Sequence, residues 1–412
     1  MRGTFAALES PTYRVFWLGA LLSFLGFFTS TVVQSIVAFE LTHANRAVGL
    51  TVLGQGIAML SLGPIGGALA DRVSKRAMLF LSQSLAGLVF LGMGILLALD
   101  LLVLPLLIGA AFGVGACISV LGPARQAYAP ELVRPDQIGN AAALNQVALN
   151  ATRIAGPALA GALLSSRFGA SGAYFTMAGL YALAVVSLLG LPPVAARKRA
   201  STGLFTELGI GLRYVARHRR LRRLILYFTL VIMTGFPYVT VMPGLVKNAL
   251  LRDADTVSWL FAISAAGGLA ASLGVARLAD SPRAHSIYSA MALLFGASLI
   301  VTARAPSITW AAIGMIGVGI GTGGFQTLNG AVVLRETEPM YYGRVMSLTL
   351  LAFGAFGIVG YPIGIMADAF GERTTLTLMG VTVCAISGAF TLLIDKDHGH
   401  PPGSEGSDEG TG

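Results

Sequence analysis

Twelve stretches of about twenty apolar residues, separated by short polar segments, constrain the fold of this 412-residue chain more than any other feature. An α-helix needs about 20 apolar residues to cross the hydrocarbon core of a bilayer. The sequence therefore predicts twelve transmembrane helices and no separate soluble domain. The expected spans are 15–40, 47–69, 77–99, 102–124, 139–164, 172–191, 222–246, 257–279, 284–303, 307–333, 344–367 and 374–394.

The composition agrees with a chain that is mostly surrounded by lipid. Hydrophobic residues make up 55% of it and charged residues only 11%, whereas a soluble domain carries about 25% charged residues. The net charge of +9 could suggest a nucleic-acid partner, but the cations lie in short loops between apolar stretches. We therefore expect an all-α integral membrane protein whose partner is the lipid bilayer and not a nucleic acid.

The loop cations also predict an orientation. If the N-terminus is cytoplasmic, 21 Lys and Arg residues fall on the cytoplasmic side and 6 on the other. Cytoplasmic loops of membrane proteins carry an excess of Lys and Arg. Both chain termini are therefore predicted to be cytoplasmic.

Two parts of the chain repeat each other. The segments 112–115 and 154–156 recur at 316–319 and 358–360, each with an offset of 204 residues. Such repeats are typical of transporters built from related helical bundles. The expected domains are an N-terminal six-helix bundle (1–191), a cytoplasmic linker (192–221), a C-terminal six-helix bundle (222–394) and a disordered cytoplasmic tail (395–412), with pseudo-two-fold symmetry between the bundles.

The linker contains an apolar stripe at helical spacing, formed by Phe205, Leu208, Leu212 and Val215. This spacing predicts an amphipathic helix on the inner membrane face. The alternative is a solvated linker without stable structure. The segment 319–324 matches the dinucleotide pattern G-x-G-x-x-G, but it lies in an apolar stretch, and we interpret it as helix packing.

The polar segment 67–79 resembles the signature loop of the major facilitator superfamily. Ser74 and Lys75 depart from the usual Gly and Arg, and a degenerate copy with Asp280 lies at 279–283. Six positions match in register: Gly67, Leu69, Asp71, Arg72, Arg76 and Leu79. The resemblance implies a secondary transporter that works by alternating access. We further expect Asp71 to accept hydrogen bonds from the start of the eleventh helix, near Tyr342 and Gly343, because the helix dipole favours an anion there.

A second resemblance is to the bacterial efflux branch that contains the enterobactin exporters, and it rests on the segments 122–133, 140–146 and 153–161. It implies a bacterial inner-membrane antiporter that exports siderophores or drug-like molecules, which would confer multidrug resistance. Part of the segment 153–161 also resembles the antiporter motif of the fifth helix. The gating residues expected from both resemblances are Gly67, Asp71, Arg72, Lys75, Arg76, Arg125, Gly156, Pro157 and Asp280.

Charged residues are almost absent from the expected membrane interior. No Asp or Glu lies near the midplane, Glu40 lies near the outer end of the first helix, and Arg153 is the one cation predicted to lie deep. A buried unpaired charge is costly, so Arg153 should face a wet cavity, carbonyl oxygens or an anionic ligand. The alternative is that carbonyl groups of neighbouring helices satisfy it. Because no acid lies near the midplane, the sequence predicts no particular coupling ion.

Amide and phenol side chains supply the other polar groups for a central pocket. The expected substrate-binding residues are Arg153, Gln146, Asn150, Gln34, Gln326, Asn329 and Tyr361. With apolar walls, such a site suits a small amphipathic molecule. The sequence thus predicts an exporter; a facilitator or importer of a small organic solute and a non-transporting membrane sensor are the alternatives.

The sequence contains no arrangement of residues that is typical of a catalytic site or a metal site. Cys117 and Cys384 lie in separate apolar stretches without metal-ligand spacing. No deep acid pair and no nucleophile with a buried base is visible. We therefore expect no enzymatic activity, no cofactor and no metal, and a chain that acts as a monomer.

Overall fold

The computed structural model describes residues 6–192, 204–276, 278, 281 and 283–398, which form helices and turns and no strand. The first half of the chain contains six long helices: α1 (Pro11–Thr42), α2 (Asn45–Arg72), α3 (Lys75–Ala98), α4 (Leu104–Tyr128), α5 (Ile138–Leu164) and α6 (Gly169–Leu189). Three short 3₁₀ turns, η1 (Ala6–Glu9), η2 (Ala129–Leu132) and η3 (Pro135–Gln137), complete this half.

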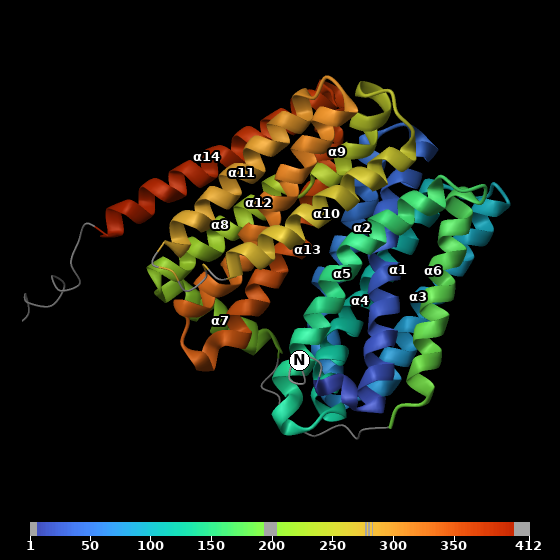
Figure 1. Ribbon diagram of the computed structural model, residues 1–412, viewed down its shortest axis with the longest axis vertical. Helices are drawn as coiled ribbons and strands as arrows, with labels where there is room; N and C mark the ends of the chain where they lie inside the picture. The colour runs from blue at the N-terminus through green and yellow to red at the C-terminus, as the bar shows by residue number, and fades with distance from the viewer. Residues whose placement is uncertain (1–5, 193–203, 277, 279–280, 282, 399–412) are drawn as a thin grey trace, which may run out of the picture.

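The second half begins with α7 (Leu204–Arg217) and ends with α14 (Glu372–His398). Between them lie α8 (Arg219–Gly235), α9 (Tyr238–Gly244), the π-helical turn η4 (Leu245–Ala249), α10 (Ala254–Ala276), α11 (Ala284–Arg304), α12 (Ile308–Arg335), η5 (Pro339–Tyr341) and α13 (Tyr342–Phe370). Figure 1 shows α1–α6 gathered into one bundle and α8–α14 into another.

The helices have the lengths that a membrane requires. Eleven described segments are long and apolar enough to cross a bilayer, and α13 contributes a further apolar stretch, Gly354–Phe370. Local signals set the helix starts: Ser10 caps α1 before Pro11, and Ser74 caps α3 by accepting the Ala77 N–H at 3.2 Å. Ser74, which replaces the glycine of the signature loop, is therefore the N-cap of α3.

Most predicted spans differ from the helices by a few residues at their ends, and two of the differences change the local structure. The span at 222–246 is interrupted, because α8 ends at Gly235, α9 begins at Tyr238 after Pro237, and η4 follows as a π-helical turn. The other difference is in α4, which runs to Tyr128 and not to residue 124. This extra turn makes Arg125 part of the helix.

Glycines let the helices of each bundle approach closely, at equivalent positions of the two repeats. A Cβ at Gly115 of α4 would lie 2.7 Å from the Gln55 carbonyl oxygen of α2. At the equivalent Gly319 of α12, a Cβ would overlap the Ser264 carbonyl oxygen of α10. Gly321 and Gly324 face α11 in the same way. The predicted packing role of the segment 319–324 is therefore confirmed.

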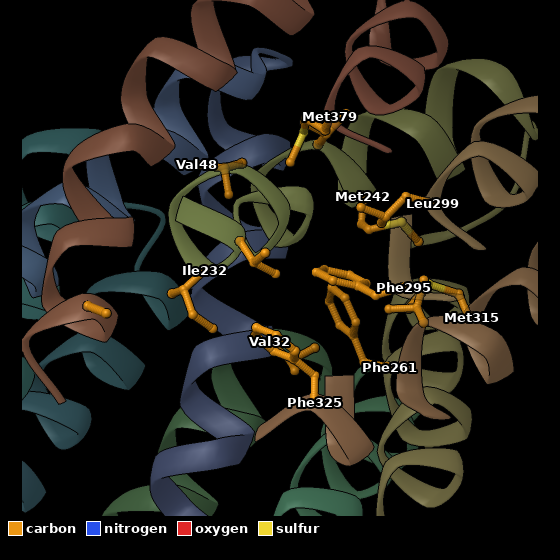
Figure 2. Packing of buried hydrophobic residues seen from close by; sticks show 14 of the residues in the cluster. Val32, Val48, Ile232, Met242, Phe261, Phe295, Leu299, Met315, Phe325 and Met379 are labelled. Carbon is orange, nitrogen blue, oxygen red and sulfur yellow. The ribbon is translucent and has the colours of Figure 1, made fainter. Parts of the chain in front are cut away.

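One large cluster of buried residues continues across the boundary between the bundles. It includes Val32 of α1 and Val48 of α2 together with Ile232, Met242 and Phe295 from the second half of the chain (Figure 2). Close van der Waals packing of these side chains holds the two bundles together along part of their length.

The linker helix α7 packs on the C-terminal bundle. The Tyr214 ring stacks on Tyr341 with centroids 4.0 Å apart, and the Tyr214 hydroxyl accepts the Glu338 N–H at 3.1 Å. Val215 of the predicted apolar stripe is buried, but Leu212 is 61% exposed. The side chains of Phe205 and Leu208 lie outside the described residues.

Candidate functional site

Three of the predicted substrate-binding residues lie on one face of α5. Gln146, Asn150 and Arg153 follow each other at i, i+4 and i+7, which places them on a single helical stripe. Gln146 Nε2 donates to Asn150 Oδ1 at 3.3 Å, and Gln146 and Arg153 are exposed. The buried residues of this helix, such as Leu144 and Ala148, lie on another face.

Contact between α5 and α1 fixes the position of Arg153 along the axis of the bundle. A Cβ at Gly156 would lie 2.5 Å from Phe28 Cβ, and the Thr29 hydroxyl donates to the Gly156 carbonyl at 3.2 Å. The Arg153 guanidinium lies 5.8 Å from the centroid of the Phe28 ring. The ion pairs found among the described residues do not include Arg153. Its guanidinium is therefore exposed and has no carboxylate partner among these ion pairs.

The other predicted binding residues lie apart from this stripe. Asn329 is buried inside the C-terminal bundle, where its Oδ1 accepts the Tyr288 hydroxyl at 2.9 Å. Gln34 is buried in α1, where its Nε2 has no hydrogen-bond partner among the described residues, and Gln326 is half-buried in α12. Tyr361 lies at the contact of α13 with α2, where a Cβ on Gly49 would be 2.8 Å from the Tyr361 Cα.

The described part of the signature loop binds elements of its own bundle. Lys75 forms an ion pair with Glu131 of η2, and the Arg76 guanidinium donates to the Leu189 carbonyl at 2.9 Å. The side chains of Gly67, Asp71 and Arg72, and all of Asp280, lie outside the described residues. The predicted contact of Asp71 with the start of α13 stays a prediction.

The prediction that Arg153 is the only deep cation is wrong, because Arg125 is 2% exposed. Its Nη2 donates to the Ser23 hydroxyl at 2.6 Å, and its guanidinium lies 4.5 Å from the centroid of the Phe24 ring. Within the part of the chain that the structure describes, Nε and Nη1 have no hydrogen-bond partner. The error arose from ending α4 one turn too early and placing Arg125 in a loop.

The two bundles meet at the end of the molecule where α1 finishes and α2 begins, here called the closed end. Glycines bring α2 and α13 together there: a Cβ at Gly49 would lie 2.5 Å from the Gly360 carbonyl oxygen, and one at Gly56 would lie 2.9 Å from Gly357 Cα. The ribbons of the two bundles approach each other at this end and diverge toward the opposite end (Figure 1). Small residues of this kind permit close helix contact in membranes.

A second contact of the closed end joins α5 to α10. A Cβ at Gly161 would lie 3.2 Å from the Ser258 Cβ, and the Ser165 hydroxyl donates to Asp255 Oδ2 at 3.2 Å. The helix pairs α2–α13 and α5–α10 thus both connect the bundles at this end.

A polar network, here called the closed-end latch, consists of Asn45, Arg46, Asn248, Asp368 and Glu372. The Asn45 and Arg46 N–H groups donate to Asp368 at 2.7 and 3.1 Å. Asn45 Nδ2 donates to Asp368 Oδ1 and Glu372 Oε1, at 3.1 Å each. Asn248 Nδ2 donates to the same Glu372 oxygen at 2.7 Å.

The carboxylate of Asp368 in the latch lies at the N-terminus of α2. The first N–H groups of α2 have no partner within the helix, and the positive end of the helix dipole favours a carboxylate there. Asp368 belongs to the other bundle, so these bonds must break if the bundles separate at this end. No local sequence pattern indicates the latch, because Asn45 and Asp368 are 323 residues apart.

These features define a polytopic helical transporter whose two bundles meet at one end. The family of transmembrane secretion effectors matches residues 2–397. The chain belongs to this family, within the major facilitator superfamily.

Curated relatives of this chain handle siderophores. The staphyloferrin A transporter of Staphylococcus aureus is 24% identical over 390 residues, which cover 93% of this chain and 96% of the relative. The enterobactin exporter of Shigella boydii is 26% identical over 275 residues, 66% of this chain and 65% of the relative.

Solved structures show the same fold. A point mutant of the nucleoside transporter NupG has a TM-score of 0.78 at 14% identity and covers 93% of this chain and 99% of its own. A bacterial homologue of the human lysosomal transporter Spinster has a TM-score of 0.77 at 14% identity, covering 96% and 99%.

Proposed function

We propose that this chain exports a small amphipathic molecule with an anionic or strongly electron-rich group, siderophore or drug-like, across a bacterial inner membrane by alternating access. The stripe of Gln146, Asn150 and Arg153 on α5 carries this proposal. An exposed guanidinium and two amides offer donors to an anionic group, and Phe28 offers an apolar face beside it.

The closed-end contacts support the alternating-access part of the proposal. With the predicted orientation, the closed end is extracytoplasmic, and the molecule is in a state that receives substrate from the cytoplasm. The glycine contact of α2 with α13 and the closed-end latch would then separate to release the substrate outside. The siderophore relatives favour export of a chelating organic acid over other substrates.

The test compares an anionic substrate candidate with a matched neutral analogue in binding to the wild type and to Arg153→Gln. A charge-assisted hydrogen bond contributes about 1.5–3 kcal/mol, against about 1 kcal/mol for a neutral one. We therefore expect the variant to bind the anionic ligand at least about tenfold less tightly and the neutral ligand at most about fivefold less tightly. Arg304→Gln, which removes an exposed cation at the end of α11, is the matched control.

Flux in proteoliposomes with imposed pH and Na⁺ gradients tests the direction and the coupling ion. Accumulation of an anionic ligand against its gradient in the export direction supports the proposal. Equal losses of both ligands in Arg153→Gln would assign Arg153 to structure. Downhill flux alone would indicate a facilitator, uphill uptake in the opposite direction an importer, and binding without flux a sensor.

A further inference from the structure

A pocket of about 200 Å³ lies at the closed end, between α1 of one bundle and α9, η4 and α10 of the other. Its floor is apolar and consists of the buried side chains Ile36, Phe39, Val246 and Val257. An apolar cavity of about 150 Å³ is enough to hold benzene. The pocket is therefore large enough for one aromatic or aliphatic ring with a small substituent.

The rim of the pocket is polar and carries an excess of positive charge. Lys247 and Arg252 line it together with Glu40, and His43 packs its ring edge-on against Phe39 with centroids 6.3 Å apart. With His left out of the count, the formal charges of these rim residues sum to +1. Asp253 also approaches Lys247, at 3.9 Å, but its side chain is 93% exposed, so solvent screens this pair.

The backbone of the second half holds both cations at this rim. The π-helical turn η4 carries Lys247, and the Leu250 N–H closes that turn on the Leu245 carbonyl at 3.0 Å. The Arg252 N–H then donates to the Val246 carbonyl at 3.1 Å, which folds the following loop back over the turn. π-Helical turns occur frequently at functional sites.

We propose that this closed-end pocket is a second ligand site, distinct from the Arg153 stripe, that binds a compact organic monoanion with an apolar body. The apolar floor receives the ring, and Lys247 and Arg252 receive the anionic group. Glu40 disfavours ligands with two negative charges. With the predicted orientation, the site takes its ligand from the extracytoplasmic side.

Occupancy of the pocket favours the closed state, because its walls come from both bundles. Separation of α1 from α9 and α10 would take the floor apart and expose the ring of the ligand to water. The neighbouring Asn248 in the same turn belongs to the closed-end latch. This conformational effect rests on the proposed alternating access, whereas binding of the anion does not.

The binding test uses 4-fluorobenzoate and the neutral 4-fluorobenzamide as probes, observed by fluorine NMR with the full-length protein in nanodiscs. We expect the double variant Lys247→Gln/Arg252→Gln to bind 4-fluorobenzoate about five- to tenfold more weakly than the wild type. Arg304→Gln, which removes an exposed cation outside both proposed sites, should leave this affinity unchanged. 4-Fluorobenzamide should bind more weakly than the acid and be insensitive to both the double variant and Arg304→Gln.

Two outcomes of this test overturn the site. In the first, the double variant binds 4-fluorobenzoate as the wild type does, or the amide binds as tightly as the acid. In the second, Arg153→Gln and not the double variant loses the anion, which assigns binding to the α5 stripe and leaves the proposed transport function intact.

The conformational effect is measured by the labelling rate of a thiol introduced by Ser258→Cys in a variant whose native cysteines are replaced by alanine. Ser258 is fully buried in the α5–α10 contact, so labelling reports opening of the closed end. Saturating 4-fluorobenzoate should slow labelling at least about twofold, and 4-fluorobenzamide should not. An unchanged rate with the anion bound would overturn the link between the pocket and the closed state.

Discussion

At the scale of single residues, the two deep arginines differ in what surrounds them. Both guanidiniums lie over an aromatic ring, but Arg153 is exposed, whereas Arg125 is buried and makes one side-chain hydrogen bond, to Ser23, within the described part of the chain. An arginine within a membrane domain is costly unless water or a partner satisfies it. The exposed Arg153 is therefore the better ligand-binding group, and the charge of Arg125 destabilises its bundle.

Replacing Arg125 should therefore raise stability. We expect Arg125→Met to raise the free energy of unfolding by about 1–2 kcal/mol, because an apolar side chain of similar length removes a buried unpaired charge. Ser23→Ala, which keeps the charge and deletes its hydrogen-bond partner, should lower it by about 1–3 kcal/mol. Thermal unfolding midpoints of the purified variants measure both changes. A midpoint that falls for Arg125→Met would show that the guanidinium is satisfied after all.

At the scale of elements, close helix contact depends on particular glycines and not on glycine content. Gly319 of α12 faces a carbonyl group of α10, while Gly330 of the same helix has no atom of the described residues within 4 Å of its Cβ position. Both residues are equally suited to helix by sequence. Only their neighbours differ.

Gly319→Ala should destabilise the protein by about 2 kcal/mol, since the added methyl group forces α10 and α12 apart. Gly330→Ala is the matched control and should be neutral or stabilising by up to about 1 kcal/mol, because alanine has the higher helix propensity. Unfolding midpoints of the two variants provide the comparison. Equal effects would mean that the tight α10–α12 contact is not maintained.

At the scale of the whole molecule, the closed-end latch sets which end of the protein is open. Asp368 binds the first N–H groups of α2 across the bundle boundary, and Glu372 joins Asn45 to Asn248. These contacts contribute only while the bundles are together at this end. They therefore stabilise one state of the transporter relative to the other.

Asp368→Asn should shift the equilibrium toward opening of the closed end by about 1–2 kcal/mol, because an amide is a weaker acceptor and does not interact with the helix dipole as an anion does. The thiol introduced by Ser258→Cys should then be labelled about five- to thirtyfold faster. Asp253→Asn removes an exposed carboxylate at the same end and should leave the rate unchanged. Equal rates for Asp368→Asn and the wild type would remove the latch from the gating mechanism.

The membrane class, the helical fold and the family could all be predicted from the sequence, because apolar length, loop charge and the motif at 67–79 are local properties of the chain. The sequence also placed Gln146, Asn150 and Arg153 on one helix and on neighbouring faces of it, because they lie within seven residues of each other. Contacts between segments that are distant in the sequence could not be predicted from it.

Which polar groups contact each other depends on the packing of helices that are distant in the sequence. This packing buried Arg125, bound Asn329 to Tyr288, brought Asp368 to the start of α2, and formed the pocket beside Lys247. Each of these depends on the rotation and separation of packed helices, which glycine contacts set to within about an ångström. Hydrophobic patterns specify that a helix is buried in the membrane, but leave open which neighbour each of its faces contacts.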